Sequence, residues 1–385
     1  MWSIVQTRRS ILSILGSATS LAAIGGTQLL LGCAPAPDAA EAWRNPGAGE
    51  MDPRRFALAH AMLAPNPHNR QPWLAKLHGD NALTLYFDTQ KLLPATDPYS
   101  RQITIGGGAF LELFSLAALK AGYQAEITSF PEGSDPQSLD QRPFAKIKMT
   151  KGGTLDPLYN QIVLRRTNRE PFDTKREIPP EMRAALATAA TRSMTQAEII
   201  ADQRLTDLRA LTDKAYKVEI MTPPAMQESV DLMRIGAKEI NAHRDGLFLD
   251  GPMIELLAAT GQITKQTLAD HNSMAFKTGL TMLEPATRSA MGYLAIKTAT
   301  NTRFDQIDAG RAYTRANLTA TSLGIAMHPL SQALQEYPEV AAEKTQMDAL
   351  TNAPSTGRLQ MLARIGYAKP IGAAPRRDWR SIVMA

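Results

Sequence analysis

A single cysteine, Cys33, stands in this chain of 385 residues. A lone cysteine excludes both a disulfide within the chain and a cysteine metal cluster, so an apolar core has to hold the fold together. Apolar residues make up 44% of the chain and charged residues 21%, which is typical of a globular protein with such a core. The part beyond residue 50 is longer than one average domain, and we therefore expect two lobes.

The residues before Cys33 have the features of an export signal. Arg8 and Arg9 precede a mildly apolar run over residues 11–31, and the first 32 residues contain no Asp or Glu. The run ends in Leu30-Leu31-Gly32-Cys33, which resembles a lipoprotein cleavage site, so we predict a signal over residues 1–32 and lipidation of Cys33. A transmembrane anchor is the alternative, but the position of the lone cysteine favours cleavage.

The paired arginines also bear on where the protein works. They resemble the twin-arginine signal, which directs export of proteins already folded around a cofactor. Residues 33–50 begin with a Pro- and Ala-rich stretch and are predicted to form a tether between the lipid and the globular part. We therefore expect a periplasmic or cell-surface lipoprotein, anchored to a membrane surface, that carries a cofactor.

Charge and motif content exclude several classes of function. The formal net charge is +5, and removal of Arg8 and Arg9 lowers it by two, which is too mild to indicate nucleic-acid binding. The six histidines are scattered and have no metal-ligand spacing. The chain has no His-Glu-x-x-His, Walker or Gly-x-Ser-x-Gly motif, so we predict neither a metal site nor a serine hydrolase.

Hydrophobic periodicity predicts an α+β fold with mixed, mostly antiparallel sheets and packed helices. We divide it into an N-terminal lobe (51–152) and a C-terminal lobe (153–385), with a possible lid at 247–285 that is hard to parse. The tail, 370–385, is expected to lie across the other lobe. The predicted helices are 53–63, 103–121, 155–165, 180–190, 205–220, 226–243 and 305–323, and the predicted strands are 73–78, 83–87, 123–130, 144–149, 292–299 and 361–367.

Three arginines and a hydroxyl lie within five residues in the second lobe. Arg165, Arg166 and Arg169 could converge on one anion, because guanidinium groups bind phosphate oxygens in bidentate fashion, and Thr167 adds a donor. The alternative is a solvated basic helix end, which the spacing alone favours because most arginines are exposed.

A Pro- and Asn-rich loop precedes Trp73. Pro65, Asn66, Pro67 and Asn69 could line a flavin ring, since Asn offers both a donor and an acceptor to its edge. An ordinary turn is the alternative, because Pro and Asn form turns for local reasons. A cationic cluster together with such a loop supplies what flavin mononucleotide (FMN) needs.

Taken together, these stretches resemble the flavin-dependent nitroreductase superfamily, in particular its two-lobed, Acg-like branch. The resemblance covers residues 64–73, 164–172 and 308–330, the strand at 362–367 and the basic tail at 375–377. It implies a nitroreductase-like fold with bound FMN, and a loop after residue 328 whose backbone N–H contacts the flavin N5. The residues it assigns to cofactor binding are Pro65, Asn66, Pro67, Asn69, Arg165, Arg166, Thr167, Arg169, Pro329, Leu330, Ser331, Gln332, Arg376 and Arg377.

The order of the motifs carries a further expectation. In ordinary nitroreductases the arginine motif comes first and each flavin lies between two subunits, whereas here the loop precedes the arginines. We expect one chain to imitate that homodimer, as a monomer with one flavin site per chain.

The resemblance implies an FMN-dependent oxidoreductase that passes hydride or electrons to nitroaromatic, quinone or similar electron-poor acceptors. Its electron donor is NAD(P)H or unknown, and no side chain is assigned as a catalytic acid or base. Two alternatives stay open. One is an exported protein that binds or sequesters FMN with little turnover, and the other is a surface lipoprotein that has lost the cofactor.

Overall fold

The structure is a computed structural model that describes residues 2–3 and 38–385, so the predicted lipidation site, Cys33, and nearly all of the predicted signal lie outside the described residues. The first lobe contains α2 (Pro53–Ala61), β2 (Trp73–His78), β3 (Ala82–Phe87), α3 (Arg101–Lys120), β4 (Tyr123–Ser129) and β5 (Ala145–Lys151). Its strands form an antiparallel sheet in the order β2-β3-β5-β4.

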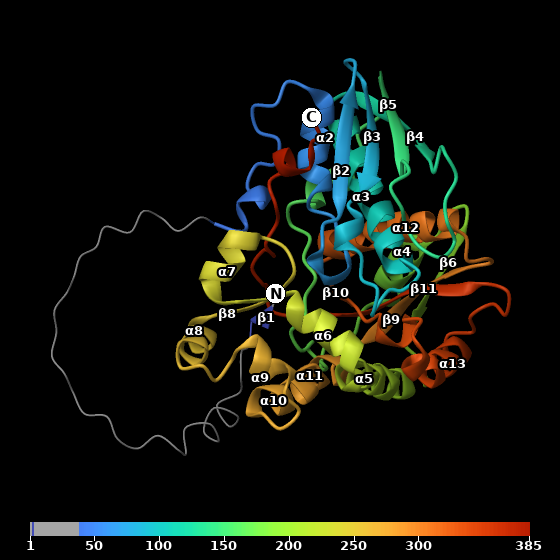
Figure 1. Cartoon of the computed structure of the whole chain (residues 1–385). Helices are drawn as coiled ribbons and strands as arrows, with labels where there is room; N and C mark the ends of the chain where they lie inside the picture. Colours follow the sequence, from blue (N-terminus) through green and yellow to red (C-terminus); the bar gives the residue numbers. More distant parts are fainter. Residues whose placement is uncertain (1, 4–37) are drawn as a thin grey trace, which may run out of the picture.

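The second lobe repeats this plan. It contains α4 (Pro180–Ala190), β6 (Thr195–Ile200), β9 (Gly292–Thr298), α12 (Arg303–Ser322), β10 (Ala326–Pro329) and β11 (Arg358–Gly366), with α13 (Ala341–Leu350) between the last two strands. The strands of its four-stranded sheet all pair antiparallel, in the order β6-β9-β11-β10. A helix, two strands, a long helix and two strands thus occur twice with the same strand order (Figure 1). The α+β class and the two lobes of one chain are confirmed.

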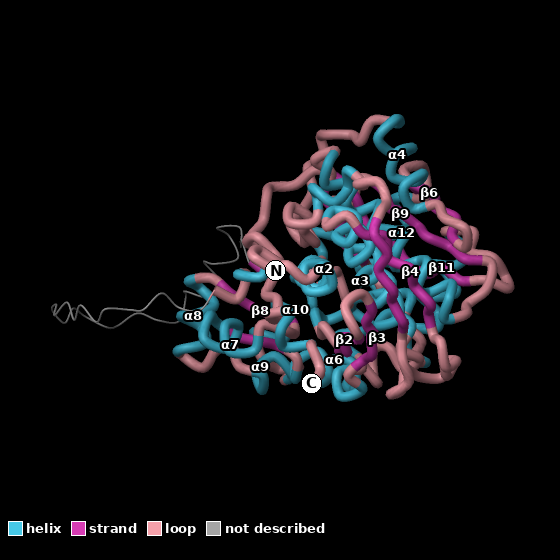
Figure 2. Tube along the Cα trace, turned by 90° about the horizontal axis from the view of Figure 1, so that it is seen from above, coloured by secondary structure: helices cyan, strands magenta, loops and turns pink. Residues whose placement is uncertain are grey.

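The two long helices, α3 and α12, pack against each other at the centre of the molecule (Figures 1 and 2). A Cβ on Gly108 would lie 2.1 Å from the carbonyl oxygen of Ile307, and a Cβ on Gly310 would lie 1.9 Å from that of Ile105. The contact is reciprocal. Each glycine lies against a backbone carbonyl of the partner helix, and that carbonyl belongs to the residue three positions before the partner's own glycine. Such self-complementary contacts are the mark of a two-fold axis in homodimers, and here the axis relates two halves of one chain.

Local sequence explains how these helices begin and where they lie. At the start of α12, Thr302 and Asp305 form a capping box, and at the start of α2 the Asp52 side chain accepts from the backbone N–H of Arg54. Helix α3 is long and apolar enough to cross a membrane, but 83% of its apolar window is buried inside the protein. It is therefore the core helix of the first lobe.

A long segment, residues 201–291, replaces in the second lobe the short hairpin turn that joins β2 to β3 in the first. We call it the inserted segment. It contains α5 (Leu205–Met221), α6 (Pro223–Asp231), β7 (Met233–Ile235), α7 (Gly236–His243), β8 (Leu247–Asp250), α8 (Pro252–Ala259), α9 (Lys265–Ala269), α10 (Met274–Met282) and α11 (Glu284–Arg288). Strands β7 and β8 form a small parallel sheet with β1 (Trp2–Ser3).

Two helix predictions in the second lobe are wrong. The helix predicted at 155–165 is a short 3-10 helix, Pro157–Gln161, because the chain then turns to bring Arg165 against Leu63. The helix predicted at 226–243 is broken by β7, which pairs with β8, and by Gly236 at φ 78°. The stretch 247–285, which is hard to parse from the sequence, is largely helical.

Both ends of the described globule pack on the first lobe. In the tail, Trp379 and Ile382 are buried in the core that contains Trp73, and the N–H of Met384 donates to Ala75. The predicted tether differs from expectation after residue 38. Trp43 is buried and its indole N–H donates to the carbonyl of Ala374 at 2.8 Å, so this part of the chain belongs to the globule.

Candidate functional site

A cavity of about 980 Å³ lies between the two lobes and the inserted segment. Its size is at the upper end of the range for pockets that hold drug-sized ligands, about 300–1,000 Å³. The Pro- and Asn-rich loop and the arginine stretch both line it, although they come from different lobes. Every residue predicted to bind the cofactor lines this cavity except Leu330 and Arg377.

The Pro- and Asn-rich loop is held in an unusual backbone conformation. His68, Asn69 and Gln71 have φ values of 47°, 52° and 49°, in the left-handed region that side chains other than glycine rarely adopt. The loop keeps this shape through its own amides: Oδ1 of Asn66 accepts from the N–H of Gln71 at 2.8 Å, and Nδ2 of Asn69 donates to the carbonyl of Pro375. Strain of this kind clusters at functional sites.

These bonds change the expected role of the two asparagines. Asn69 also accepts from the Arg376 guanidinium at 2.6 Å, and the Asn66 amide N–H donates to the carbonyl of Ala64. Both side chains are therefore used to fix the loop and the tail. A ring placed here would meet the surfaces of Pro65 and Pro67.

Four cationic side chains line one end of the cavity: Arg165, Arg166, Arg169 and Arg376. Three of them donate hydrogen bonds to backbone carbonyls: Arg165 to that of Leu63, Arg166 to that of Val163 and Arg376 to that of Ala64. The indole of Trp43 lies 4.7 Å from the Arg166 guanidinium and 5.3 Å from that of Arg376, which is a cation–π geometry. Trp43 was not identified from the sequence as a site residue.

Arg169 differs from its neighbours, because its guanidinium has no hydrogen-bond or ion-pair partner among residues 38–385. None of the four arginines has a carboxylate within 4.0 Å in the part of the chain that the structure describes. Burial lowers the pKa of all four, that of Arg165 to about 10. Buried charges in proteins are normally paired, so the cluster lacks an anion and fits a phosphate group.

The loop after β10 faces the same cavity. Leu330 is buried in the core of the second lobe and its N–H donates to the carbonyl of Leu362, so it does not contact the cavity. Among the described residues, the backbone N–H groups of Ser331 and Gln332 have no acceptor. They remain available as donors to a bound ring.

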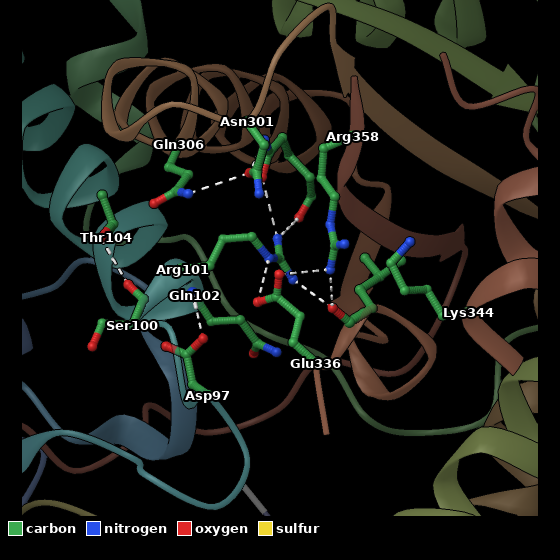
Figure 3. A network of polar contacts seen from close by, with 12 residues as sticks. Asp97, Ser100, Arg101, Gln102, Thr104, Asn301, Gln306, Glu336, Lys344 and Arg358 are labelled. Atoms are coloured by element: carbon green, nitrogen blue, oxygen red, sulfur yellow. Dashed lines mark hydrogen bonds and ion pairs between the residues drawn. The ribbon is translucent and has the colours of Figure 1, made fainter. Parts of the chain in front are cut away.

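An ionic network fixes this loop to the first lobe (Figure 3). Arg101, at the start of α3, donates to the carbonyls of Leu334 and Gln360 at 2.8 and 2.9 Å and pairs with Glu336. Glu336 also pairs with Arg358 at 3.0 Å. The loop that carries Ser331 therefore has its position set from both lobes.

Arg377 does not join the cationic cluster. Its backbone N–H donates to Oε1 of Gln71 at 2.8 Å and its guanidinium donates to the carbonyl of Gln71. The side chain therefore supports the Pro- and Asn-rich loop from behind, and the basic tail contributes one arginine to the cavity, Arg376.

Several cavity residues carry no signal in the sequence. His68 bonds to the hydroxyl of Ser229 at 3.0 Å, and burial lowers its pKa to about 4, so its imidazole is neutral. His328 accepts from Nε of Arg364 at 2.9 Å, which together with burial lowers its pKa. The hydroxyl of Tyr313 has no partner within the described residues, and burial raises its pKa to about 12. Within residues 2–3 and 38–385, no group of three His, Cys, Asp or Glu side chains could hold a metal ion.

Comparison with known proteins places the chain beside nitroreductases. No family model matches. The chain is 27% identical over 340 residues to "Putative NAD(P)H nitroreductase acg" of Mycobacterium tuberculosis H37Rv, covering 84% of this chain and 92% of that protein. It is 24% identical over 342 residues to "Putative NAD(P)H nitroreductase Rv3131" of the same organism, covering 86% and 90%. The chain is thus similar to Acg-like proteins over most of its length.

Solved structures match at lower similarity. The FMN-dependent nitroreductase NfnB from Mycobacterium smegmatis, in complex with NADPH, aligns with a TM-score of 0.34 and 22% identity, over 55% of this chain and 86% of that one. The FMN- and NADPH-dependent nitroreductase NfnB from Sphigopyxis sp. strain HMH aligns with a TM-score of 0.37 and 15% identity, over 60% and 99%.

Proposed function

We propose that this protein is an FMN-dependent oxidoreductase of the nitroreductase kind. The observation that carries the proposal is the cluster of buried and half-buried arginines that have no carboxylate partner among the described residues and face the Pro- and Asn-rich loop across one cavity. The names of the Acg-like relatives support an NAD(P)H-dependent nitroreductase activity. The resemblance seen in the sequence and the geometry of the cavity point to the same cofactor.

The cavity residues would contact FMN in three ways. Arg165, Arg166, Arg169 and Arg376, with Thr167, would bind the phosphate end. The loop that contains Pro65 and Pro67 would orient the ring, and the N–H groups of Ser331 and Gln332 would donate to its edge. Bound FMN supplies the hydride chemistry, whereas the protein supplies binding, orientation and a dry site.

Electron-poor acceptors such as nitroaromatics and quinones are the substrates we propose, with NAD(P)H or another reductant as donor. The inserted segment favours a second candidate, an FMN-sequestering protein with little turnover. Met274, Lys277, Thr281 and Pro285 of this segment line the cavity, so α10 and α11 cover part of it. NADH consumption with a quinone as acceptor distinguishes the two, because a sequestering protein would bind FMN and turn over slowly.

Substitution of Arg169 tests the phosphate site. Arg169→Gln should weaken FMN binding about 10- to 100-fold, since a charge-assisted hydrogen bond contributes about 1.5–3 kcal/mol. The thermal unfolding midpoint of the FMN-free protein should not fall, because this guanidinium bonds to none of the described residues. Affinity is measured by quenching of FMN fluorescence.

The matched control is Arg55→Gln, which removes an exposed arginine that does not line the cavity. Equal FMN affinity in both variants would contradict the phosphate site. A parent protein that binds no FMN at all would contradict the proposed function as a whole.

We also propose export by the twin-arginine pathway and lipidation at Cys33, from the motifs around Arg8, Arg9 and Cys33. Cleavage before Cys33 would remove β1 and leave β7 and β8 as a pair. Cys33→Ser should move the protein from the membrane fraction to the soluble fraction, as measured by fractionation of the producing cells. A variant that stays membrane-bound would overturn the proposed lipid anchor.

A further inference from the structure

A buried carboxyl group occupies the cavity away from the arginines. Glu219 of α5 is 6% exposed and lines the cavity, and its Oε2 has no hydrogen-bond partner among the described residues. No lysine or arginine lies within 4.0 Å of it in the same part of the chain. This acid has the opposite charge to the arginine cluster and, like the cluster, has no partner of opposite charge among the described residues. Because buried charges in proteins are normally paired, a cationic ligand would suit this place.

Two glutamines complete the surroundings of this acid. Gln332 and Gln335, from the loop after β10, lie near this acid, and their side chains oppose the rise in its pKa that burial causes. Oε1 of Gln332 and Oε1 of Gln335 are both buried without a partner among the described residues, and both side chains line the cavity.

Three buried acceptors without a partner among the described residues therefore belong to side chains that line the same cavity. The cavity wall also includes Ile220, Leu283 and Met361, which suit a hydrocarbon body. A buried polar atom left without a partner destabilises the folded protein, so a ligand that supplies the missing donors gains affinity at this place.

We propose that Glu219, Gln332 and Gln335 form a subsite for a protonated amine carried on an apolar, ring-sized molecule. The ammonium group would donate to Oε2 of Glu219 and to the two amide oxygens, and the ring would contact the apolar wall. Binding of such a ligand does not depend on FMN. The further statement that this ligand is the substrate rests on the proposed function, since Gln332 belongs to the loop expected beside the flavin ring.

The charge on Glu219 sets the pH dependence of the subsite. Burial raises the pKa of Glu219 to about 7, with a contribution from Glu228 on α6, while the two glutamines oppose the shift. Tyr216 on the same helix donates to the carbonyl of Gly279, Tyr337 lies close by, and Lys277 and Arg288 line the same cavity from α10 and α11. An ammonium ion binds the ionised carboxylate, so affinity should rise from pH 6 to pH 8.

The test is calorimetric titration of the full globule, as purified, with benzylamine, and with benzyl alcohol as a neutral probe of the same shape. Benzylamine should bind at least 10-fold more tightly than benzyl alcohol at pH 8. Glu219→Gln should abolish that preference, whereas Glu339→Gln, an exposed acid outside the cavity, should keep it.

Equal binding of the two probes, binding of neither, or an unchanged preference in Glu219→Gln would each overturn the subsite. The absorbance of bound flavin, read on the same sample, keeps this result apart from the proposed function. A colourless protein that still prefers benzylamine would support the subsite and contradict the proposed oxidoreductase function. A yellow protein without the preference would support the proposed function and contradict the subsite.

Discussion

Glu219 carries a charge that the folded state disfavours at neutral pH. Its pKa in the fold is about 7, above the ordinary value of 4.5, because burial penalises the carboxylate. The folded state therefore binds more protons than the unfolded chain between pH 4.5 and 7, and this residue's contribution to stability falls as the pH rises through that window. A group kept at such a cost is characteristic of a functional site.

The expected result is a stability gain on removing the charge. At pH 8, Glu219→Gln should raise the free energy of unfolding by on the order of 3 kcal/mol, as the shift from 4.5 to about 7 predicts. Below pH 4.5 both proteins carry a neutral side chain here and the difference should vanish. Urea unfolding at the two pH values measures it, and a variant less stable than the parent at pH 8 would contradict this account of the burial.

Individual site residues could be predicted only where the sequence carries a local pattern. The arginine stretch and the loop before Trp73 are such patterns, and both line the cavity. By contrast, Asn69 meets Arg376 across 307 positions and Trp43 meets Ala374 across 331. Contacts of that separation depend on the whole fold, so Trp43, His68 and Glu219 could not be recognised in advance.

At the level of helices and strands, the contact between α3 and α12 fixes how closely the two lobes approach. Gly108→Ala would place a Cβ 2.1 Å from a backbone oxygen that cannot rotate away. The helices would have to separate, which typically costs 1–3 kcal/mol or more, so we expect a fall of several degrees in the thermal unfolding midpoint.

Gly279→Ala in α10 is the matched control, because a Cβ there meets nothing within 4 Å. It should raise the free energy of unfolding by about 0.4–1 kcal/mol, because alanine lowers the conformational entropy of the unfolded chain. Two variants of equal stability would mean that the helices do not pack as closely as described.

Periodicity predicted most of the repeated elements, because each of them has one face in a core. It located α2, β2, β3, α3 and α12 within a few residues. It failed for α6, β7 and α7, where a three-residue strand pairs with β8 across a turn and no local pattern marks the break. It also missed β6 and β10, whose neighbours in the sheet are strands far away in the sequence.

For the molecule as a whole, the internal two-fold relation raises the question of a second site. The position equivalent to Arg101, by the same offset that relates Gly108 to Gly310, is Arg303. Its guanidinium donates to Thr104 at 3.1 Å and to the carbonyl of Asp135 at 2.9 Å, so it bonds to the loop between β4 and β5. A pocket in that loop holds only about 10 Å³.

One FMN per chain is therefore the expected stoichiometry. It is measured by releasing the flavin with acid, reading its absorbance, and dividing by the protein concentration from amino-acid analysis. A ratio of two would show that the repeated half also holds a cofactor and would contradict a single site per chain.

The inserted segment shows what a fused repeat permits. In a symmetric dimer every mutation appears twice, so a segment that covers one active site must also cover the other. Here the hairpin turn of one half stayed short while the same point in the other half grew into the wall of the cavity. Gene duplication followed by fusion would have allowed the two halves to change independently. One half could then keep the compact fold while the other acquired the segment that determines which ligands enter the cavity.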